Sequence, residues 1–276
     1  IDSLKQNPEF RKSEIWFFVD GANNKVDQKK RTEVIRLIKN LNHKNKKLVT
    51  KKNNVGLREN ILDGISKIFE KNNKIIVLED DLIVAKNFLN YMNQALVLYR
   101  DKTNIFHISG WSPQIKFTSQ NQTEFFSKAM FCWGWGTWSD RWQGANFDSD
   151  FSDLKADNIY ELNYENNMLT WNQIIQNKLG LKSTWAAFWG TYIYQMKGLC
   201  LNPYKSLVIN IGEDGTGTNS RRKETKSIIF DNENTDFFKH NLNYVEKREH
   251  REMIIEHYSN EVNKISKFVS DLAYYI

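Results

Sequence analysis

The sequence predicts an α/β protein with a mostly parallel sheet flanked by helices. The first observation is that short apolar runs rich in β-branched and aromatic residues alternate with segments of helical periodicity, each 10 to 15 residues long. This alternation is typical of strand–helix–strand units. The second observation is that the strand runs are apolar at successive positions, as in strands buried on both faces.

The elements follow one another in a regular order. Residues 1–12 are predicted to be the end of a helix and a polar turn, and strands are predicted at 15–19, 47–50, 74–79 and 105–109. Apolar residues at helical spacing mark the helices between the strands. They are Val34, Ile38 and Leu41; then Leu57, Ile61, Ile65 and Ile68; then Phe88, Met92, Ala95 and Tyr99.

Three carboxylates follow directly after the third strand, at Glu79, Asp80 and Asp81. Ligands of open α/β sheets gather at the carboxyl ends of the strands. Carboxylates crowded there repel one another unless a cation holds them, and Mg²⁺ or Mn²⁺ prefers oxygen ligands. The structural alternative is that Asp80 or Asp81 caps the next helix.

Asp20 and Gly21 end the first strand and have two interpretations. The carboxylate could accept a hydrogen bond from a base or ribose, or the pair could simply begin a turn.

Aromatic residues interleaved with glycine follow the fourth strand. Trp111 lies in the loop after Gly110, and Trp133, Trp135 and Trp138 lie within six residues, separated by Gly134 and Gly136. Because glycine lets a ligand approach the backbone closely, the pattern favours a cleft with flat rings for sugar faces or bases. The alternative is an aromatic core.

A later segment, residues 210–222, combines three glycines with Glu213, Asp214, Arg221 and Arg222. Such a segment could close over an anionic ligand, and it could equally be a solvated surface loop. The chain from Asn243 is predicted to form one long helix with Ile254, Tyr258, Val262 and further apolar residues on a single face. This face packs on the protein body or, with its neighbouring cations, touches a membrane.

Composition sets the broad class. The chain of 276 residues has a net charge of +6 and contains 9 Trp, 11 Tyr and 17 Phe, which indicates a globular protein with an anionic partner. Only Cys132 and Cys200 are present, a number typical of a reducing, cytoplasmic setting. No apolar run reaches the length of a membrane span, and no signal peptide is visible. Abundant Lys and Asn are typical of an AT-rich bacterial genome.

Several motifs together resemble the N-acetylglucosaminyltransferase I family. The similar segments are 78–88, with its Glu-Asp-Asp version of the Asp-X-Asp motif; 108–111; the Gly-Trp segment 131–135; the loop 206–217; and Asp20. The resemblance implies a glycosyltransferase A-like, Rossmann-like fold, and its layout is most similar to bacterial transferases of surface-polysaccharide synthesis. An opening strand is expected before the segment that ends near Pro8.

The resemblance also implies roles for individual residues. Asp81 would bind Mn²⁺ or Mg²⁺, which holds the diphosphate of a UDP-sugar. Asp20, Gly21, Arg58, Glu79, Asp80 and Arg221 would form the donor site, and Trp111, Trp133, Trp135 and Trp138 the acceptor site. The family carries two aspartates, one of them its catalytic base, where this chain has Ala186 and Ala187. The base is therefore expected at Asp214, then Glu213 or Asp140.

The leading hypothesis is a metal-dependent, inverting glycosyltransferase whose acceptor is a glycan or a lipid-linked saccharide. Residues 1–115 would form the donor half, 116–225 the acceptor and catalytic half, and 226–276 a helical tail. Nucleic acid is not an expected partner, and a cytoplasmic protein, with the inner membrane face as an alternative position, is expected. The rival hypotheses are a nucleotidyltransferase of similar fold and a non-catalytic module that binds saccharide or nucleic acid.

Overall fold

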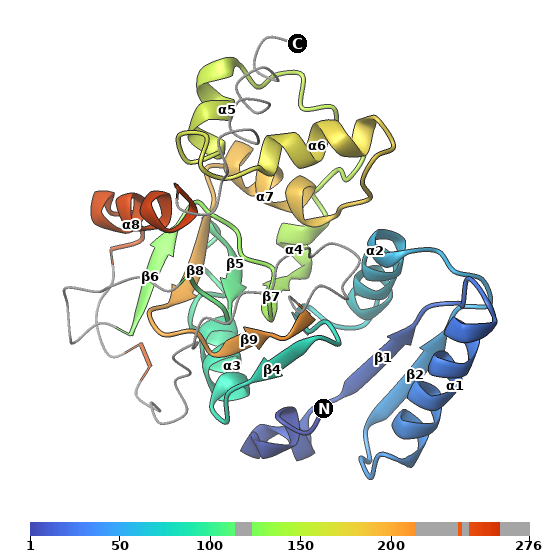
Figure 1. The fold of residues 1–276 in the computed structure, drawn as a ribbon. Coiled ribbons are helices and arrows are strands. Elements are labelled where there is room, and N and C mark those ends of the chain that lie inside the picture. Colours follow the sequence, from blue (N-terminus) through green and yellow to red (C-terminus); the bar gives the residue numbers. More distant parts are fainter. Residues whose placement is uncertain (114–122, 213–236, 239–242, 260–276) are drawn as a thin grey trace.

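The computed structural model describes residues 1–113, 123–212, 237–238 and 243–259. Within these residues the chain forms an α/β fold with a mixed five-stranded central sheet, two two-stranded sheets and surrounding helices (Figure 1). In chain order, the elements up to the fifth strand are η1 Leu4–Gln6, η2 Pro8–Lys12, β1 Ile15–Val19, α1 Lys25–Asn40, β2 Lys46–Thr50, α2 Leu57–Phe69, β3 Lys74–Val77, β4 Leu82–Val84, α3 Phe88–Leu98 and β5 Ile105–Ser109. The remaining elements are β6 Glu124–Ser127, β7 Trp135–Trp138, α4 Ser139–Trp142, α5 Ala156–Leu162, α6 Thr170–Lys178, α7 Ala186–Gln195, β8 Leu199–Pro203, β9 Val208–Asn210 and α8 Arg248–Ser259.

The α/β class is confirmed, but the prediction of a mostly parallel sheet is wrong for the central sheet. Its strand order is β3-β7-β5-β8-β6, and only the β5–β8 pair is parallel. β7 enters between β3 and β5 and runs antiparallel to both, and the edge strand β6 runs antiparallel to β8. A parallel pair of the expected kind forms between β1 and β2, with α1 alongside.

The predicted strands and helices of the first half are present, with two differences at their ends. The segment 1–12 forms two short 3-10 helices. The third strand ends at Val77, so Leu78 to Asp81 form a turn, and the short strand β4, which the sequence pattern did not predict, follows and pairs antiparallel with β9.

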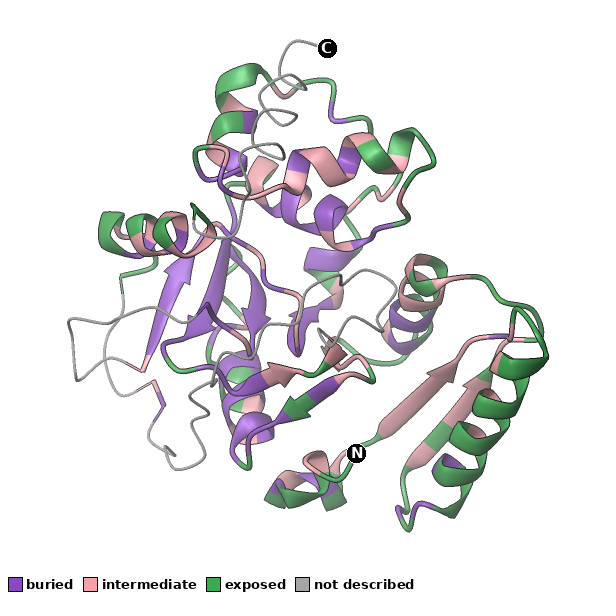
Figure 2. Ribbon diagram, viewed as in Figure 1, coloured by how far each residue is buried: buried purple, intermediate pink, exposed green. Residues whose placement is uncertain are grey.

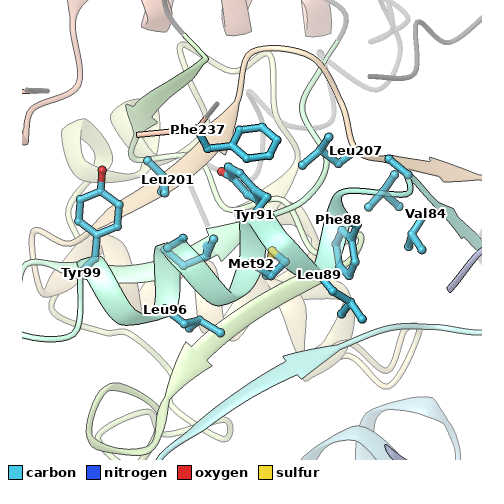
Figure 3. Packing of buried hydrophobic residues seen from close by; sticks show 14 of the residues in the cluster. Val84, Phe88, Leu89, Tyr91, Met92, Leu96, Tyr99, Leu201, Leu207 and Phe237 are labelled. Carbon is cyan, nitrogen blue, oxygen red and sulfur yellow. The ribbon is translucent and has the colours of Figure 1, made fainter. Parts of the chain in front are cut away.

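The core around α3 is built by the periodicity that the sequence displays. Phe88, Met92 and Ala95 are fully buried, and Tyr99 is nearly so. Figure 3 shows α3 beside Leu201, Leu207 and Phe237, and Tyr91, which is also fully buried, packs edge to face on Phe237. The buried helix α3 follows β4 after residues 85–87, and it therefore fixes the end of β4 that is remote from the carboxylate turn.

Burial differs between the central sheet and the β1–β2 pair. The strands β5 to β8 are buried throughout, whereas all residues of β1 are half-buried and most of α1 is exposed (Figure 2). α2 packs against both β1 and β3 and so connects the β1–β2 pair to the central sheet.

The C-terminal helix starts later than predicted, at Arg248, and packs on the protein body. Ile254 is fully buried in a cluster with Phe125, Phe131 and Tyr204, and α8 contacts β6. The predicted apolar positions from Val262 onward lie outside the described residues. Strands from both sides of residue 115 pair in one sheet, and the division into donor, acceptor and tail segments stays a prediction.

Candidate functional site

The carboxylate turn connects β3 to β4. Val77 is the last residue of β3 and pairs with Trp135, and Leu82 begins β4 opposite Asn210. Glu79 and Asp81 are half-buried, whereas Asp80 is exposed. The turn therefore brings two carboxylates into the protein between two pairs of strands.

Within the part of the chain that the structure describes, these carboxylates lack compensating charges. Burial, with the charges of Asp81 and Asp80, raises the pKa of Glu79 to about 7. Burial, with the charge of Asp80, also raises the pKa of Asp81. Asp81 Oδ1 is buried and has no hydrogen-bond partner, and in the described part of the chain no cation pairs with either side chain. A buried carboxylate oxygen without a hydrogen bond lowers the stability of the folded protein unless a ligand binds to it.

β9 closes the turn from the other side. The Ile211 amide donates to the Asp81 carbonyl oxygen at 2.8 Å, and the Gly212 amide donates to Asn210 Oδ1 at 2.7 Å. A Cβ at Gly212 would collide with the Asp81 carboxylate. Glycine is therefore required for this close approach. The candidate residues Glu213, Asp214 and Arg221 follow Gly212 and lie outside the described residues.

The aromatic segment reaches the same end of the sheet because β7 begins there. The Gly110 amide donates to the Gly134 carbonyl oxygen at 2.6 Å, and a Cβ at Gly134 would approach Leu78 and Val208. Gly134 adopts a positive φ of 63°, which glycine tolerates without strain. Residues 132–134 thus lie beside the residue that precedes Glu79.

Two of the four predicted acceptor tryptophans lie near this end of the sheet and are partly exposed. Trp111 and Trp133 pack edge to face with ring centroids 4.8 Å apart. Such a pair can offer a flat, amphipathic surface to a sugar.

The other two tryptophans are wholly buried, a placement that does not suit the predicted acceptor role. Trp135 stacks between His107 and Trp185, at centroid distances of 5.2 and 5.0 Å. Trp138 donates its indole N–H to the Leu96 carbonyl oxygen and pairs with Lys74, at the opposite end of β3 from Glu79. The spacing of Trp and Gly in the sequence therefore does not show which of these rings belong to the core and which are accessible to a ligand.

Asp140 also lies away from the carboxylate turn, which does not suit its predicted role as the catalytic base. It follows Trp138 at the distal end of β7 and forms ion pairs with Arg100 at 3.0 Å and Arg141 at 2.6 Å. Burial alone would raise the pKa of Asp140, but the ion pairs with Arg141 and Arg100 outweigh it and hold the pKa below its usual value.

The described contacts of Asp20 and Arg58 are structural. Asp20 accepts hydrogen bonds from the amides of Gly21, Val55 and Gly56 at 2.7 to 3.0 Å, and a Cβ at Gly21 would collide with the Asn53 backbone. This network ties the end of β1 to the start of α2. Arg58 pairs with Glu59 and Asp148 and donates to the Phe147 carbonyl oxygen. Their donor-binding roles stay predictions.

Three residues near the turn were not singled out by the sequence. Cys132 and Lys182 act electrostatically on each other, and Cys132 also lies within the fields of Glu79 and Asp81. His107 accepts from the Trp189 indole N–H at Nδ1, so its Nε2–H donates to the Phe131 carbonyl oxygen at 2.9 Å and holds the segment before Cys132. Lys182 is one of many lysines, and His107 stands alone in its strand, so neither residue belongs to a sequence motif that would mark a functional site.

The described residues contain no group of three or more His, Cys, Asp or Glu side chains that could hold a metal ion by themselves. None of the helices within the described ranges is both long and apolar enough to span a membrane. The sequence matches no protein-family model, and no curated protein is detectably similar to it.

Proposed function

We propose that this protein is a metal-dependent glycosyltransferase that transfers a sugar from a UDP-sugar to a glycan or lipid-linked saccharide. The observation that carries the proposal is the carboxylate turn, with its buried, unpartnered Asp81 oxygen and the raised pKa of Glu79. Two half-buried carboxylates without a counter-charge among the described residues favour a cationic ligand at this position.

The residues present fit Mn²⁺ or Mg²⁺. Mg²⁺ is commonly held by one or two carboxylates together with the phosphates of a substrate, and its remaining positions keep water. Asp81 would be the protein ligand, with Glu79 and Asp80 beside the donor. When bound, such a cation would offset the negative charge of the departing nucleoside diphosphate.

The acceptor side is proposed at the partly exposed pair Trp111 and Trp133. Aromatic rings bind the apolar faces of sugars while their N–H groups remain free for hydroxyls. The position of residues 132–134 beside Leu78 supports this assignment, because donor and acceptor must meet near the turn.

Transfer with inversion needs a general base that removes a proton from the acceptor hydroxyl. Asp214 is the first candidate and Glu213 the second. The close packing of Gly212 on Asp81 supports both candidates equally, because the chain leading to both residues starts at the carboxylate turn.

The proposed biological setting rests on the resemblance of the sequence motifs to bacterial transferases of surface-polysaccharide synthesis. We propose a role in bacterial surface-polysaccharide synthesis, in the cytoplasm or at the inner face of the membrane. Nucleic acid is not a proposed partner.

The proposal is tested by thermal unfolding of the protein with nucleotides and nucleotide sugars, each with and without Mn²⁺. A ligand that binds only the folded state stabilises it by about 2.7 kcal/mol at a hundredfold excess over its Kd. We expect a shift in Tm that needs both Mn²⁺ and a uridine diphosphate compound. A shift with nucleoside triphosphates alone, with release of pyrophosphate, would instead identify a nucleotidyltransferase, and no shift with any nucleotide would reject both.

A further inference from the structure

The positive charge of this protein is concentrated in residues 24–52, which comprise α1, β2 and the turns at their ends. This segment contains eleven Lys and Arg and two acidic residues, so its net charge is +9. The whole chain has a net charge of +6, and the rest of the chain therefore carries −3. A local excess of this kind attracts an anionic partner to one part of the surface.

α1 is attached to the protein along one side and is a preformed helix. On the attached side Ile38 is buried, and Arg31 donates to the carbonyl oxygens of Asp20 at 2.8 Å and Lys51 at 2.9 Å. The side chain of Asn24 caps the first turn by accepting from two backbone amides. Figure 1 shows α1 at the outer edge of the molecule, beyond β1 and β2. A large partner can therefore reach its outer side.

The outer surface of α1 combines exposed cations with exposed apolar side chains. The exposed cations are Lys25, Lys29, Lys30, Arg36 and Lys39. Val26 and Leu37 are each 63% exposed. Val26, Lys30 and Leu37 follow one another at intervals of four and seven residues, so they lie on nearly one line along the helix. Figure 2 shows the exposed surface that continues along α1.

The exposed cations of α1 are not used to hold the fold. In the part of the chain that the structure describes, none of these five side chains forms an ion pair, whereas Lys47 and Lys51 nearby pair with Glu14 and Asp63. Their charge is therefore available to an external anion.

The apolar side chains favour a lipid surface over nucleic acid as that anion. A helix that lies in a membrane interface places Lys and Arg at the headgroups and apolar side chains at the acyl boundary. Proteins that bind single-stranded nucleic acid combine cations with aromatic rings that stack on bases, and α1 contains no aromatic residue. In α8, by contrast, the apolar Ile254 is fully buried in the protein.

We propose that α1 is a membrane-docking helix that binds an anionic lipid surface. Its five exposed cations contact the lipid phosphates, and Val26 and Leu37 contact the acyl chains. With 16 residues the helix is about 24 Å long, so all of these side chains can reach the surface when α1 lies flat on it. The inference shares with the proposed function only the position at a membrane. It is tested without nucleotide or sugar, so the two proposals can fail separately.

The test is sedimentation of the full chain with vesicles of phosphatidylcholine alone and of phosphatidylcholine mixed with phosphatidylglycerol. The charge variant replaces three exposed cations of α1 together: Lys29→Gln, Lys30→Gln and Arg36→Gln. The matched control removes the same charge from exposed residues outside 24–52: Lys155→Gln, Lys197→Gln and Lys205→Gln. The apolar variant is Leu37→Gln, which keeps a residue that favours helix.

The wild type should bind the mixed vesicles, should not bind phosphatidylcholine alone, and should dissociate as salt is raised, because salt screens surface charges. The charge variant should bind on the order of a hundredfold more weakly, since three cations leave the lipid surface. Leu37→Gln should bind about tenfold more weakly, and the matched control should stay within about twofold of wild type. Because the replaced side chains are exposed, all variants should keep the Tm and circular dichroism of wild type.

Several results would overturn the inference. It is wrong if the wild type binds neither kind of vesicle, or if the charge variant and the matched control lose the same affinity, because net charge alone would then explain binding. Unchanged binding by Leu37→Gln would also contradict it, since the apolar contact would be absent. It is wrong as well if the wild type binds a single-stranded oligonucleotide more tightly than the mixed vesicles and the charge variant loses that binding. In each case the Tm shift with Mn²⁺ and uridine diphosphate compounds still decides the proposed function.

Discussion

The two ends of the β3–β7 pair carry carboxylates in opposite electrostatic conditions. At one end, Asp140 is shared between Arg100 and Arg141, and its pKa is held below the usual value. At the other end, Glu79 and Asp81 have raised pKa values, and one buried Asp81 oxygen has no hydrogen-bond partner among the described residues. The strands are the same, so the difference comes from the neighbouring side chains.

This difference separates a structural carboxylate from a candidate functional one. A carboxylate that serves the fold is surrounded by the groups that stabilise its ionised form. A carboxylate that binds a ligand lacks such groups in the ligand-free protein, and the folded protein is less stable because of it. The comparison therefore predicts opposite effects of neutral substitutions at the two ends.

The largest effect is expected from Asp81→Asn. An amide is a much weaker ligand for Mn²⁺ or Mg²⁺ than a carboxylate, so we expect a loss of about 10³-fold in metal-dependent transfer, typical for removal of a transition-state charge stabiliser. Sugar transfer from a UDP-sugar at saturating Mn²⁺ measures this effect.

The control for Asp81→Asn is folding, since the amide also relieves repulsion in the turn. The variant should unfold at the same Tm as metal-free wild type or at a higher one. UDP binding that still strengthens with Mn²⁺ in this variant would place the metal elsewhere.

Glu79→Gln should stabilise the metal-free protein at alkaline pH. The folded pKa of about 7 lies above the usual 4.5. Below pH 4.5 the carboxyl is protonated in both states, and above pH 7 the folded state bears the cost of its charge. From the shift we expect a gain on the order of 3 kcal/mol at pH 8, which disappears toward pH 4.5.

Urea unfolding of both proteins in EDTA at pH 8 and pH 4.5 measures the gain from Glu79→Gln. A variant that is less stable than wild type at pH 8 would mean that the Glu79 carboxylate has a stabilising partner. In that case Glu79, like Asp140, would be a carboxylate that the surrounding protein stabilises.

Trp133→Ala tests the aromatic side of the turn. Loss of a sugar-binding ring should raise the KM of the acceptor about tenfold, corresponding to the ~1–1.5 kcal/mol that an aromatic contact contributes. The KM of the donor should change less than twofold. Trp16→Ala is the matched control, because Trp16 lies half-buried on β1 and outside the central sheet. Equal changes in both variants would point to general destabilisation.

Local patterns in the sequence predicted the elements well where burial repeats regularly. The strands 15–19 and 105–109 and the buried face of α3 agree with their apolar periodicity. The position of β7 was not predictable in the same way. Its four residues pair with β3 and β5, which are distant in sequence, and Trp-Gly alternation is compatible with either a cleft or a core.

The candidate site was predictable only in part for a related reason. The carboxylates at 79–81 are adjacent in sequence, and their chemistry is visible there. Cys132 packs in one cluster with Val77 and Trp185, which are both distant from it in sequence. Asp140 was placed beside the site because it follows the tryptophans, but the antiparallel register of β7 carries it to the far end.

Asp140→Asn is the smallest expected effect, and it should have the opposite sign to Glu79→Gln. Asp140 is half-exposed, so loss of its ion pairs should lower the free energy of unfolding by no more than about 1 kcal/mol at pH 7. Because the folded pKa is lowered, the stabilising effect of Asp140 exists above the unfolded pKa and fades as pH falls through the folded value. The wild type and the variant should therefore become equally stable in acid.

Activity decides whether the two ends are as different as the charges indicate. Since Asp140 lies at the far end of β7 and is held by Arg100 and Arg141, kcat for sugar transfer should stay within twofold of wild type in Asp140→Asn. A loss of a hundredfold or more in kcat, with the pH profile of a missing general base, would mean that Asp140 reaches the reacting hydroxyl. The paired end would then be catalytic as well, and the absence of a counter-charge would no longer distinguish a ligand site from a structural carboxylate in this fold.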